Sequence, residues 1–446
     1  MIDNKNMIIA VVLSILILVG FEWYFSKNRP APTEEQAQSE LVQPTPGQAT
    51  PNIPKAAANQ PSPPQQGAPV PTAPGLPTAA KESSLMALLK NGDRIKIETP
   101  RLHGSIALIG GRMDDLSLPD YRETLEPDSD EIVLLIPKGA KDAYFAEFGW
   151  VPGGGQTGPT ADTVWKSDRK TLSQETPVTL TWDNGKGLKF SRTIAIDDKY
   201  MFTITQSVKN TGTSAATLFP YGLISRRSTP EVSGFYIIHE GLMGVANETL
   251  KEISYDDLKE QGQVKDTATG GWIGITDKYW LTALVPDQKA KVNSRFLFRR
   301  DNGEDLYQAD YLSAAVTIAP GQTARSENRL FAGAKEVTTM DAYNEQLGID
   351  RFDLTIDFGW FYFLTKPIFY ALLYINNIVL NFGISIILLT MGIKLVFFPL
   401  ANKSYTSMSR MKKLTPQITK LRERFKDDKT HLNQEMMELY KREKVN

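Results

Sequence analysis

The pattern of hydrophobic and polar positions changes several times along the 446 residues, and each change predicts a different kind of element. Residues 7–25 are apolar except for Ser14 and Glu22, a length that suits a helix crossing about 30 Å of hydrocarbon. The next residues show no small-residue cleavage pattern, and Trp23 with Tyr24 is typical of an aromatic interfacial anchor. The pattern therefore favours an uncleaved membrane anchor over a cleaved signal peptide.

Residues 26–83 lose this hydrophobic pattern. Thirteen of the 27 prolines fall between positions 30 and 77, among Gln, Ala, Thr and Gly. Such a composition cannot bury a core, so we expect an extended, disordered tether. A Pro-rich docking site for a partner domain is the alternative, but the segment lacks the flanking basic residues expected of one.

Apolar and polar residues alternate with a period of two at many places in residues 84–345, as they do in half-buried strands. The clearest runs are residues 178–182, 190–194 and 201–205, and the Asp, Asn and Gly residues between them predict turns of an antiparallel meander. Roughly 260 residues of this kind predict a large antiparallel β-sandwich. Further strands are expected at residues 94–99, 272–276, 281–286, 292–298 and 315–318.

Aromatic residues crowd the last part of the next segment, residues 346–382, where one lysine and three asparagines interrupt them. This composition predicts an amphipathic helix that lies in the outer membrane interface, rather than another full crossing. Pro367 is expected to bend this helix or to open its main part. The candidate interfacial residues are Trp360, Phe361, Tyr362, Phe363 and Lys366.

One positive charge, Lys394, lies inside the apolar run of residues 383–400, which predicts a second membrane helix. A lysine near the middle of such a helix costs about 2.5 to 3.5 kcal/mol on insertion scales, so it normally faces a water-filled cavity or a polar partner. The alternative is snorkelling, because at about 1.5 Å per residue Lys394 lies roughly 13 Å from Lys403 along a helix. The residues alone leave both interpretations open.

Beyond residue 400 the hydrophobic period becomes three to four, and basic residues accumulate. Apolar stripes on either side of Asp427 and Asp428 predict two antiparallel helices in residues 401–446. The four methionines of these helices suit either the core between them or a surface that adapts to varied apolar partners. The candidate contact residues are Met408, Arg410, Met411, Lys412, Lys413, Arg422, Arg424, Met436 and Met437.

Composition limits the chemistry that this chain can carry. It contains no cysteine, and its three histidines, His103, His239 and His431, are widely spaced, which leaves little from which to build a metal centre or a histidine-dependent triad. We expect no catalytic residue, no metal site and no cofactor. A net charge of -1 at pH 7 gives no general attraction to DNA.

The basic residues also predict orientation. They directly follow the second span, so that side is cytoplasmic by the positive-inside rule. The first span then runs outward from a cytoplasmic N-terminus. The predicted order is N-terminus 1–6, first span 7–25, tether 26–83, β-sandwich 84–345, connecting segment with interfacial helix 346–382, second span 383–400 and cytoplasmic hairpin 401–446.

This order of parts, together with several motifs, resembles the YidC/Oxa family of bacterial inner-membrane protein insertases. The likeness covers essentially the whole chain. It is carried by Gly359-Trp-Phe-Tyr-Phe363, Ser385-Ile-Ile-Leu-Leu-Thr390, Phe398-Pro-Leu400, Lys403-Ser-Tyr-Thr-Ser-Met408, Arg422-Glu-Arg424, Asp427-Asp-Lys429 and Gln434-Glu-Met-Met437.

The resemblance implies a multi-pass protein of the Gram-negative inner membrane, with a large periplasmic β-sandwich similar to that of sugar mutarotases. It implies a membrane insertase and chaperone, not an enzyme, that receives the polar tail of its client in a hydrophilic intramembrane groove. Lys394 stands where the family usually has the groove arginine. The implied partners are nascent membrane proteins, the ribosome, the Sec translocon and the lipid bilayer.

Two departures from the family pattern affect these expectations. A lysine attracts a carboxylate but lacks the planar five-donor fork of an arginine. Four further spans would follow Asn446 in the family, so we expect the chain to be part of a longer protein. The rival interpretation is a membrane-anchored periplasmic protein that binds or modifies sugars, which would need a carboxylate and a histidine in one pocket.

Overall fold

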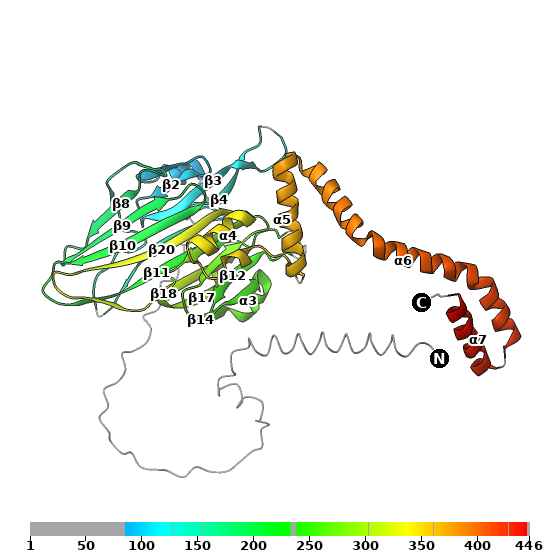
Figure 1. The fold of residues 1–446 in the computed structure, drawn as a ribbon. Helices are drawn as coiled ribbons and strands as arrows, with labels where there is room; N and C mark the ends of the chain where they lie inside the picture. Colours follow the sequence, from blue (N-terminus) through cyan, green and yellow to red (C-terminus); the bar gives the residue numbers. More distant parts are fainter. Residues whose placement is uncertain are drawn as a thin grey trace, which may run out of the picture. The chain divides into compact units, whose positions relative to one another are not determined.

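The computed structural model describes residues 85–443, except residues 127, 154, 233–237, 302, 360 and 427. The predicted first span and tether, residues 7–25 and 26–83, lie outside the described residues. The described chain divides into two compact units between Tyr362 and Phe363. The first unit is a β-sandwich with short helices, and the second is helical (Figure 1).

One layer of the sandwich is an 11-stranded sheet. Its strands are β1 (Arg94–Glu98), β2 (His103–Ala107), β3 (Arg112–Arg122), β4 (Glu131–Leu135), β5 (Tyr144–Pro152), β7 (Thr171–Leu172), β11 (Ala216–Arg227), β14 (Gln263–Thr269), β17 (Lys291–Asp301), β18 (Glu304–Ser313) and β19 (Val316–Ile318). The main path runs β14-β17-β18-β11-β5-β3-β2-β1-β7, while β4 pairs with β3 and β19 pairs with β11. Among these pairs, β1 and β7 are parallel and the others are antiparallel.

The other layer is a nine-stranded antiparallel sheet. Its strands are β6 (Lys166–Ser167), β8 (Val178–Asp183), β9 (Leu188–Ile196), β10 (Met201–Asn210), β12 (Gly241–Ala246), β13 (Thr249–Ser254), β15 (Trp272–Thr276), β16 (Trp280–Val285) and β20 (Thr323–Ala334). They follow the order β13-β12-β15-β16-β20-β10-β9-β8-β6. The predicted fold class, a large antiparallel β-sandwich combined with helices, is confirmed.

The predicted meander corresponds to β8, β9 and β10, which pair in sequence order. Asn184 closes the first turn, because its Oδ1 accepts hydrogen bonds from the backbone N–H groups of Lys186 and Leu188 at 2.8 and 2.9 Å. Gly185 follows with a φ of 67°, a conformation that costs a glycine little. Turn chemistry and strand alternation therefore agree at this point of the sequence.

The long central strands β5, β11 and β18 were not predicted from the sequence. In β18, eight consecutive residues are buried, and β5 and β11 contain similar runs. β5 and β11 are covered on both faces and their buried runs are mostly apolar, so the alternating pattern disappears there. In β18, Gln308 and Asp310 do alternate with Tyr307, Ala309 and Tyr311, but all five side chains are buried. The strands that the sequence did not reveal therefore lie in the middle of this sheet.

The core lies between the two sheets, and short helices extend it. The largest fully buried side chains include Trp150, Phe190 and Phe202, which come from both layers. Phe352 packs edge-on against Trp272 of β15 and Phe331 of β20, with ring centroids 5.5 and 5.7 Å away. These contacts attach the end of the domain to the nine-stranded sheet. The helices of this unit are α2 (Leu85–Leu89), α3 (Tyr255–Gln261), α4 (Val337–Gln346) and the 3₁₀ helix η1 (Phe352–Thr355).

The second unit consists of α5 (Tyr362–Val379), α6 (Phe382–Arg424) and α7 (Lys429–Arg442). A turn at Leu380, which has a φ of 55°, separates α5 from α6. The 43-residue α6 bends along its length in Figure 1. Its two internal prolines, Pro399 and Pro416, each remove one helical hydrogen bond, which explains the bending.

Candidate functional site

The first half of α6 contains polar residues that the helix satisfies by itself. Asn381 caps the helix, since its Oδ1 accepts a hydrogen bond from the backbone N–H of Ile384 at 3.1 Å. The hydroxyls of Ser385 and Thr390 donate to backbone carbonyls four residues earlier, at 2.8 and 2.7 Å. Such internal bonds remove most of the cost of a hydroxyl in hydrocarbon.

Lys394 lies one turn after Thr390 on the same helix, and its side chain is exposed. An ammonium carries three donors and a charge, so a single backbone carbonyl cannot satisfy it as it satisfies a hydroxyl. Among the described residues, α6 is the helix that is long and apolar enough to cross a membrane. The groove around Lys394 stays a prediction.

The helix does not end at the predicted membrane boundary. It continues past Leu400 to Arg424, so the predicted second span and the first helix of the predicted hairpin form one element. Pro399 has no N–H to donate to the Leu395 carbonyl. A backbone acceptor without its helical donor therefore lies directly next to Lys394 in the sequence.

The predicted interfacial helix corresponds to α5, which contains Pro367 in its interior. Phe361, Tyr362 and Phe363 are 61 to 67% exposed, and Lys366 is half-buried. Trp360 lies outside the described residues. Three consecutive exposed aromatic side chains suit a membrane interface, although the interfacial location itself stays a prediction.

The predicted hairpin is formed by the second half of α6 and by α7. Leu414 and Leu439, each 4% exposed, meet in its centre. Asp428 caps α7, because its Oδ1 accepts hydrogen bonds from the backbone N–H groups of Thr430 and His431 at 3.1 and 3.0 Å. A small apolar contact and one cap thus hold the two helices together.

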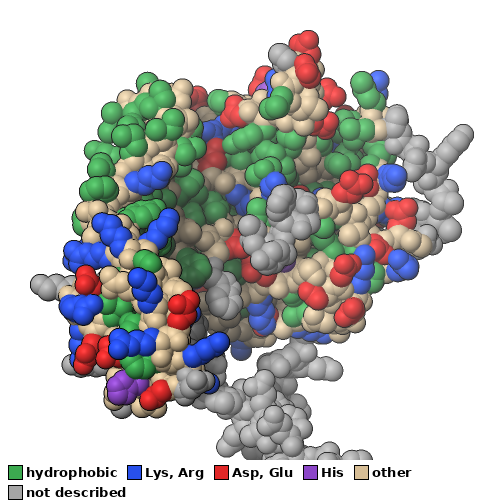
Figure 2. Space-filling model, turned by 90° about the vertical axis from the view of Figure 1, so that its right-hand side faces the viewer, with side chains coloured by type: hydrophobic (Ala, Val, Ile, Leu, Met, Phe, Trp, Pro, Cys, Tyr) green, Lys and Arg blue, Asp and Glu red, His purple; other side chains and the backbone are tan. Residues whose placement is uncertain are grey.

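The four methionines divide between the two interpretations that the sequence left open. Met408 and Met411 are 63 and 38% exposed, whereas Met436 and Met437 are half-buried. Figure 2 shows Lys and Arg side chains around this hairpin with acidic side chains among them, and hydrophobic side chains over the apolar part of α6. The predicted cationic contact residues are all exposed, namely Arg410, Lys412, Lys413, Arg422 and Arg424.

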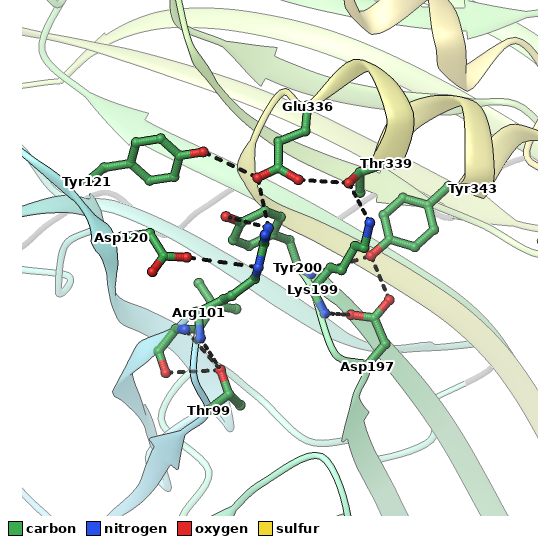
Figure 3. Close-up of polar contacts among 11 residues, drawn as sticks. Thr99, Arg101, Asp120, Tyr121, Asp197, Lys199, Tyr200, Glu336, Thr339 and Tyr343 are labelled. Atoms are coloured by element: carbon green, nitrogen blue, oxygen red, sulfur yellow. Dashed lines mark hydrogen bonds and ion pairs between the residues drawn. The ribbon is translucent and has the colours of Figure 1, made fainter. Parts of the chain in front are cut away.

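A polar network lies where α4 packs against the sandwich (Figure 3). At its centre the Glu336 carboxylate accepts hydrogen bonds from Arg101 at 2.8 Å, from the Thr339 hydroxyl at 2.9 Å and from the Tyr121 hydroxyl at 3.3 Å. Arg101 also donates to the Tyr200 hydroxyl at 3.2 Å. The network therefore ties β3 of one sheet, and Tyr200 directly before β10 of the other, to the beginning of α4.

The electrostatics of this network indicate a structural role. Burial would raise the pKa of Glu336, but the hydrogen bonds from Thr339 and Arg101 outweigh it and hold that pKa below its usual value. Burial raises the pKa of Tyr121, and the neighbouring Glu336 adds to the effect. A carboxylate that stays charged and a phenol that keeps its proton are poorly suited to general acid–base chemistry near pH 7.

The rival interpretation needed a histidine and a carboxylate in one pocket. His103 Nδ1 does lie 3.2 Å from Glu131 Oε1, but this pair is solvent-exposed, with the His103 side chain 51% exposed. His239 Nε2 lies 3.0 Å from the Leu242 carbonyl. His239 and Glu252 line the same cavity, so this pocket does contain a histidine and a carboxylate. Within the residues that the structure describes, there is no group of three or more His, Asp or Glu side chains that could hold a metal ion.

Two family models match consecutive parts of the chain. The model described as the YidC periplasmic domain matches residues 94–371, and the model described as the 60Kd inner membrane protein matches residues 374–446. The first match covers the sandwich and part of α5, and the second covers α6 and α7.

Curated relatives match over the whole chain. Membrane protein insertase YidC of Methylobacterium radiotolerans is 47% identical over 456 residues, covering 100% of this chain and 73% of the relative. The proteins of that name from Bradyrhizobium diazoefficiens and Nitrobacter hamburgensis are 46 and 47% identical and likewise cover 100% of this chain. The chain belongs to the YidC family of membrane protein insertases.

Membership of the YidC family confirms the resemblance that the sequence motifs indicated, and it does not favour the sugar-modifying alternative. Among solved structures, a galactose mutarotase related enzyme from Lactobacillus acidophilus is similar with a TM-score of 0.37 and 10% identity, over 54% of this chain and 97% of that one. A galactose mutarotase-like protein from Lactobacillus casei has a TM-score of 0.36 and 10% identity, over 54% of this chain and 99% of that one.

Sequence reasoning missed the network around Glu336 in this YidC-family chain. Its members are scattered between residues 99 and 343, so no local spacing reveals them. The one local signal is the pair Glu336 and Thr339, which stands at the start of α4 as N-terminal residues of a helix often do.

Proposed function

We propose that Lys394 supplies the positive charge of a hydrated intramembrane groove, through which this insertase admits the polar tail of a client membrane protein. The protein integrates nascent membrane proteins into the inner membrane. Family membership supports this function, and the position of Lys394 on α6 supports the proposed mechanism.

The single observation that carries the mechanism is the contrast between Lys394 and the other polar residues of the span. Ser385 and Thr390 bond to their own helix, whereas Lys394 retains a charge and three donors. The neighbouring Leu395 carbonyl lacks its helical donor because of Pro399. A cation and an acceptor at one membrane depth both favour access of water.

Such a groove would lower the barrier to insertion in two ways. It shortens the path through hydrocarbon for polar groups that otherwise cost several kcal/mol each. The client's apolar segment then leaves for the lipid, driven by burial at roughly 25 cal/mol per Å². These steps need no nucleotide or cofactor.

We further propose the topology predicted from the basic residues, with residues 84–345 in the periplasm and residues 401–446 in the cytoplasm. The exposed candidate residues of the hairpin would contact nascent chains or ribosomal RNA there, namely Met408, Arg410, Met411, Lys412, Lys413, Arg422 and Arg424. The ribosome and the Sec translocon are proposed partners on the same grounds. Attraction of the hairpin to anionic lipid is the alternative for its basic residues.

The charge of Lys394 can be tested by comparing Lys394→Ala and Lys394→Arg with wild type, in cells depleted of their own insertase. For a client with an acidic translocated tail, Lys394→Ala should lower insertion roughly tenfold, as expected from the loss of about 1.4 kcal/mol of attraction. Lys394→Arg should retain insertion, because it keeps the charge.

Lys403→Ala is the matched control, since it removes an exposed cation nine residues along the same helix. It should leave insertion unchanged, and so should Lys394→Ala for a client whose tail carries no acid. Equal insertion of the acidic client by Lys394→Ala and wild type, at equal protein levels, would exclude the lysine charge from the mechanism.

The hairpin contact is tested separately by ribosome co-sedimentation at increasing salt. Binding should weaken with salt, because release of counterions from RNA contributes to it, and it should fall after deletion of residues 401–446. Binding that responds to neither change would contradict the proposed contact.

A further inference from the structure

A cavity of about 620 Å³ lies where the chain leaves the sandwich on its way to α5. Its volume is typical of sites that enclose a small molecule or a few side chains. We call it the exit pocket, and its main lining residues are Tyr121, Met243, Trp280, Ala334, Lys335 and Ile356. None of these residues takes part in the mechanism proposed for Lys394.

The aromatic wall of the exit pocket is held in place without a ligand. The ring of Tyr121 meets Trp280 edge-on, with centroids 5.0 Å apart and an interplanar angle of 73°. The Tyr121 hydroxyl donates to Glu336, which Arg101 and Thr339 also hold (Figure 3). A wall that is fixed in advance loses little entropy on binding.

The floor of the exit pocket is apolar and its mouth is open. Met243 and Ala334 are 2 and 4% exposed, whereas Tyr279 at the mouth is 58% exposed. An apolar side chain that enters from solvent would therefore exchange water for hydrocarbon and aromatic surface, which favours binding.

Three basic residues, Arg122, Lys278 and Lys335, lie within this mostly apolar lining. Lys335 Nζ donates to Thr276 Oγ1 at 2.8 Å, and an ammonium has three donors. Burial lowers the pKa of Lys335 to about 8, against the opposing effect of nearby carboxylates, chiefly Asp277 and Glu240. Because that pKa is above 7, the side chain is mostly charged at neutral pH.

We propose that the exit pocket binds an extended polypeptide segment, which places an aromatic side chain against Tyr121 and Trp280 and an adjacent carboxylate near Lys335. Glu252 and Asp357 also line the pocket, and their carboxylates can accept backbone N–H groups of a peptide. The lining thus combines the basic Arg122, Lys278 and Lys335 with two carboxylates. A peptide offers both hydrogen-bond donors and acceptors to such a lining, whereas a lipid phosphate offers acceptors alone, so the mixed charge favours a peptide.

The position of the pocket along the chain suggests where the segment comes from. Asp357 precedes Tyr362, the first residue of α5, by five residues, and five residues span at most about 18 Å. The pocket is thus within that distance of the proposed interfacial helix. The proposed occupant is the translocated part of an inserting membrane protein, and only this identification of its source rests on the insertase function.

Binding can be measured with the full chain in lipid nanodiscs and a fluorescein-labelled peptide, Ala-Ala-Phe-Glu-Ala-Ala, by fluorescence anisotropy. Matched peptides carry Ser in place of Phe or Gln in place of Glu. We expect about tenfold weaker binding when Phe is replaced, as for removal of an aromatic anchor. A smaller, severalfold loss is expected for Gln.

Variants of the protein should reproduce these losses. Trp280→Ala removes half of the aromatic wall, and Lys335→Met removes the cation proposed to bind the peptide carboxylate, so each should weaken binding of the Phe-Glu peptide about tenfold. Lys289→Met is the control, because Lys289 is exposed beyond the opposite end of β16. That variant should bind like wild type.

A crosslinking measurement avoids any dependence on the folding of Trp280→Ala. The photoreactive residue p-benzoylphenylalanine at position 279, an exposed site at the mouth, should capture the labelled peptide, and unlabelled Phe-Glu peptide should compete. The same probe at position 289 should capture little. Equal capture at both positions, or equal affinity for the Phe-Glu, Ser-Glu and Phe-Gln peptides, would overturn the proposal.

The failure of this proposal can be told apart from the failure of the groove mechanism. Lys394→Ala should bind the peptide like wild type while it loses insertion of the acidic client. If pocket variants bind normally and Lys394→Ala still impairs insertion, the pocket assignment alone is wrong. If Lys394→Ala inserts normally and the pocket variants lose the peptide, the groove mechanism alone is wrong.

Discussion

The two units of this protein treat their charged side chains in opposite ways. In the sandwich, Arg192 is fully buried, and its guanidinium donates to the backbone carbonyls of Gly111, at 2.7 Å, and of Phe148. Asp310 is buried as well, and it accepts hydrogen bonds from Arg295 at 2.9 Å and Gln308 at 2.6 Å. In α6 and α7, by contrast, the cations lie on the surface.

This difference shows which of the two units compensates its charged side chains with its own residues. Buried charges persist in a fold only where fixed partners compensate for lost water. The sandwich provides such partners from its own residues, although Arg192 Nε and Asp310 Oδ1 are left without one. Among its described residues, the helical unit buries Ser385 and a small apolar cluster around Leu414 and Leu439, and it exposes apolar and basic side chains together. Such a surface is expected where lipid, client or ribosome provides the contacts.

Among the substitutions that test this comparison, Arg192→Met should cause the largest loss of stability. The substitution leaves the carbonyls of Gly111 and Phe148 without their donor, and the ring of Trp165, 4.8 Å from the guanidinium, without its cation. Loss of a buried, hydrogen-bonded charge costs about 3–5 kcal/mol. Chemical denaturation monitored by tryptophan fluorescence should show that loss.

Arg325→Met is the control for Arg192→Met. Arg325 is 66% exposed and pairs with Glu327 at 3.4 Å, and exposed pairs contribute about 0–1 kcal/mol. If both variants lose the same stability, the internal partners of Arg192 do not hold the sandwich together.

A somewhat smaller effect is expected from Leu414→Ala, which removes one half of the hairpin contact. Truncation of a well-buried leucine costs about 2–5 kcal/mol, and the small size of this cluster places the cost near the lower limit. Because the two units are separate, hydrogen exchange should accelerate in α7 and stay unchanged in the sandwich. Faster exchange in both units would contradict their independence.

A third effect depends on pH and concerns Lys335 of the exit pocket. The pKa of Lys335 is lowered by burial to about 8, from 10.5 in an unfolded chain. The unfolded state therefore binds more protons between pH 8 and 10.5, so this group makes stability rise with pH in that interval. Below pH 8 both states are protonated, and the cost of burying the charge is constant.

Lys335→Met should remove this dependence. The variant should be more stable than wild type at pH 7, and the difference should shrink as pH rises from 8 toward 10.5. Thermal unfolding at pH 7, 9 and 10 measures the difference between the two proteins, which cancels the titration of other groups. A constant difference across this range would show that Lys335 is not the group responsible.

The sequence predicted the parts of the molecule whose chemistry is local. Alternation and turn residues located β8, β9 and β10, and periodicity located the two stripes that meet at Leu414 and Leu439. Lys394 stood out because a charge contrasts with its apolar neighbours. In each case, a short stretch of sequence contains the whole signal.

The rest could not be predicted because the signal is distributed. β5 is buried over seven consecutive residues, with Glu147 as the one charged residue among them, so its sequence has no polar face that would mark it as a strand. Arg101 and Glu336 are 235 residues apart, and Tyr121 and Trp280 meet only once the sheets have formed. The continuation of α6 past Leu400 was missed for a different reason, since Pro399 is usual at a helix boundary but is tolerated inside this helix.

Met408→Ala should have the smallest effect on folding, and it is the most direct test of the difference between the two units. Met408 is 63% exposed, so its truncation should change hairpin stability by no more than about 0.5 kcal/mol, far less than Leu414→Ala. If the helical unit completes its contacts with partners, the same variant should still reduce photocrosslinking between the hairpin and a nascent client, because an exposed methionine adapts to varied apolar partners. Comparing hydrogen exchange in α7 with the crosslinking yield separates a role of Met408 in hairpin stability from a role in client contact. Normal exchange together with normal crosslinking would mean that Met408 is merely solvated, and the exposed apolar surface of the hairpin would then need a lipid partner instead of a protein one.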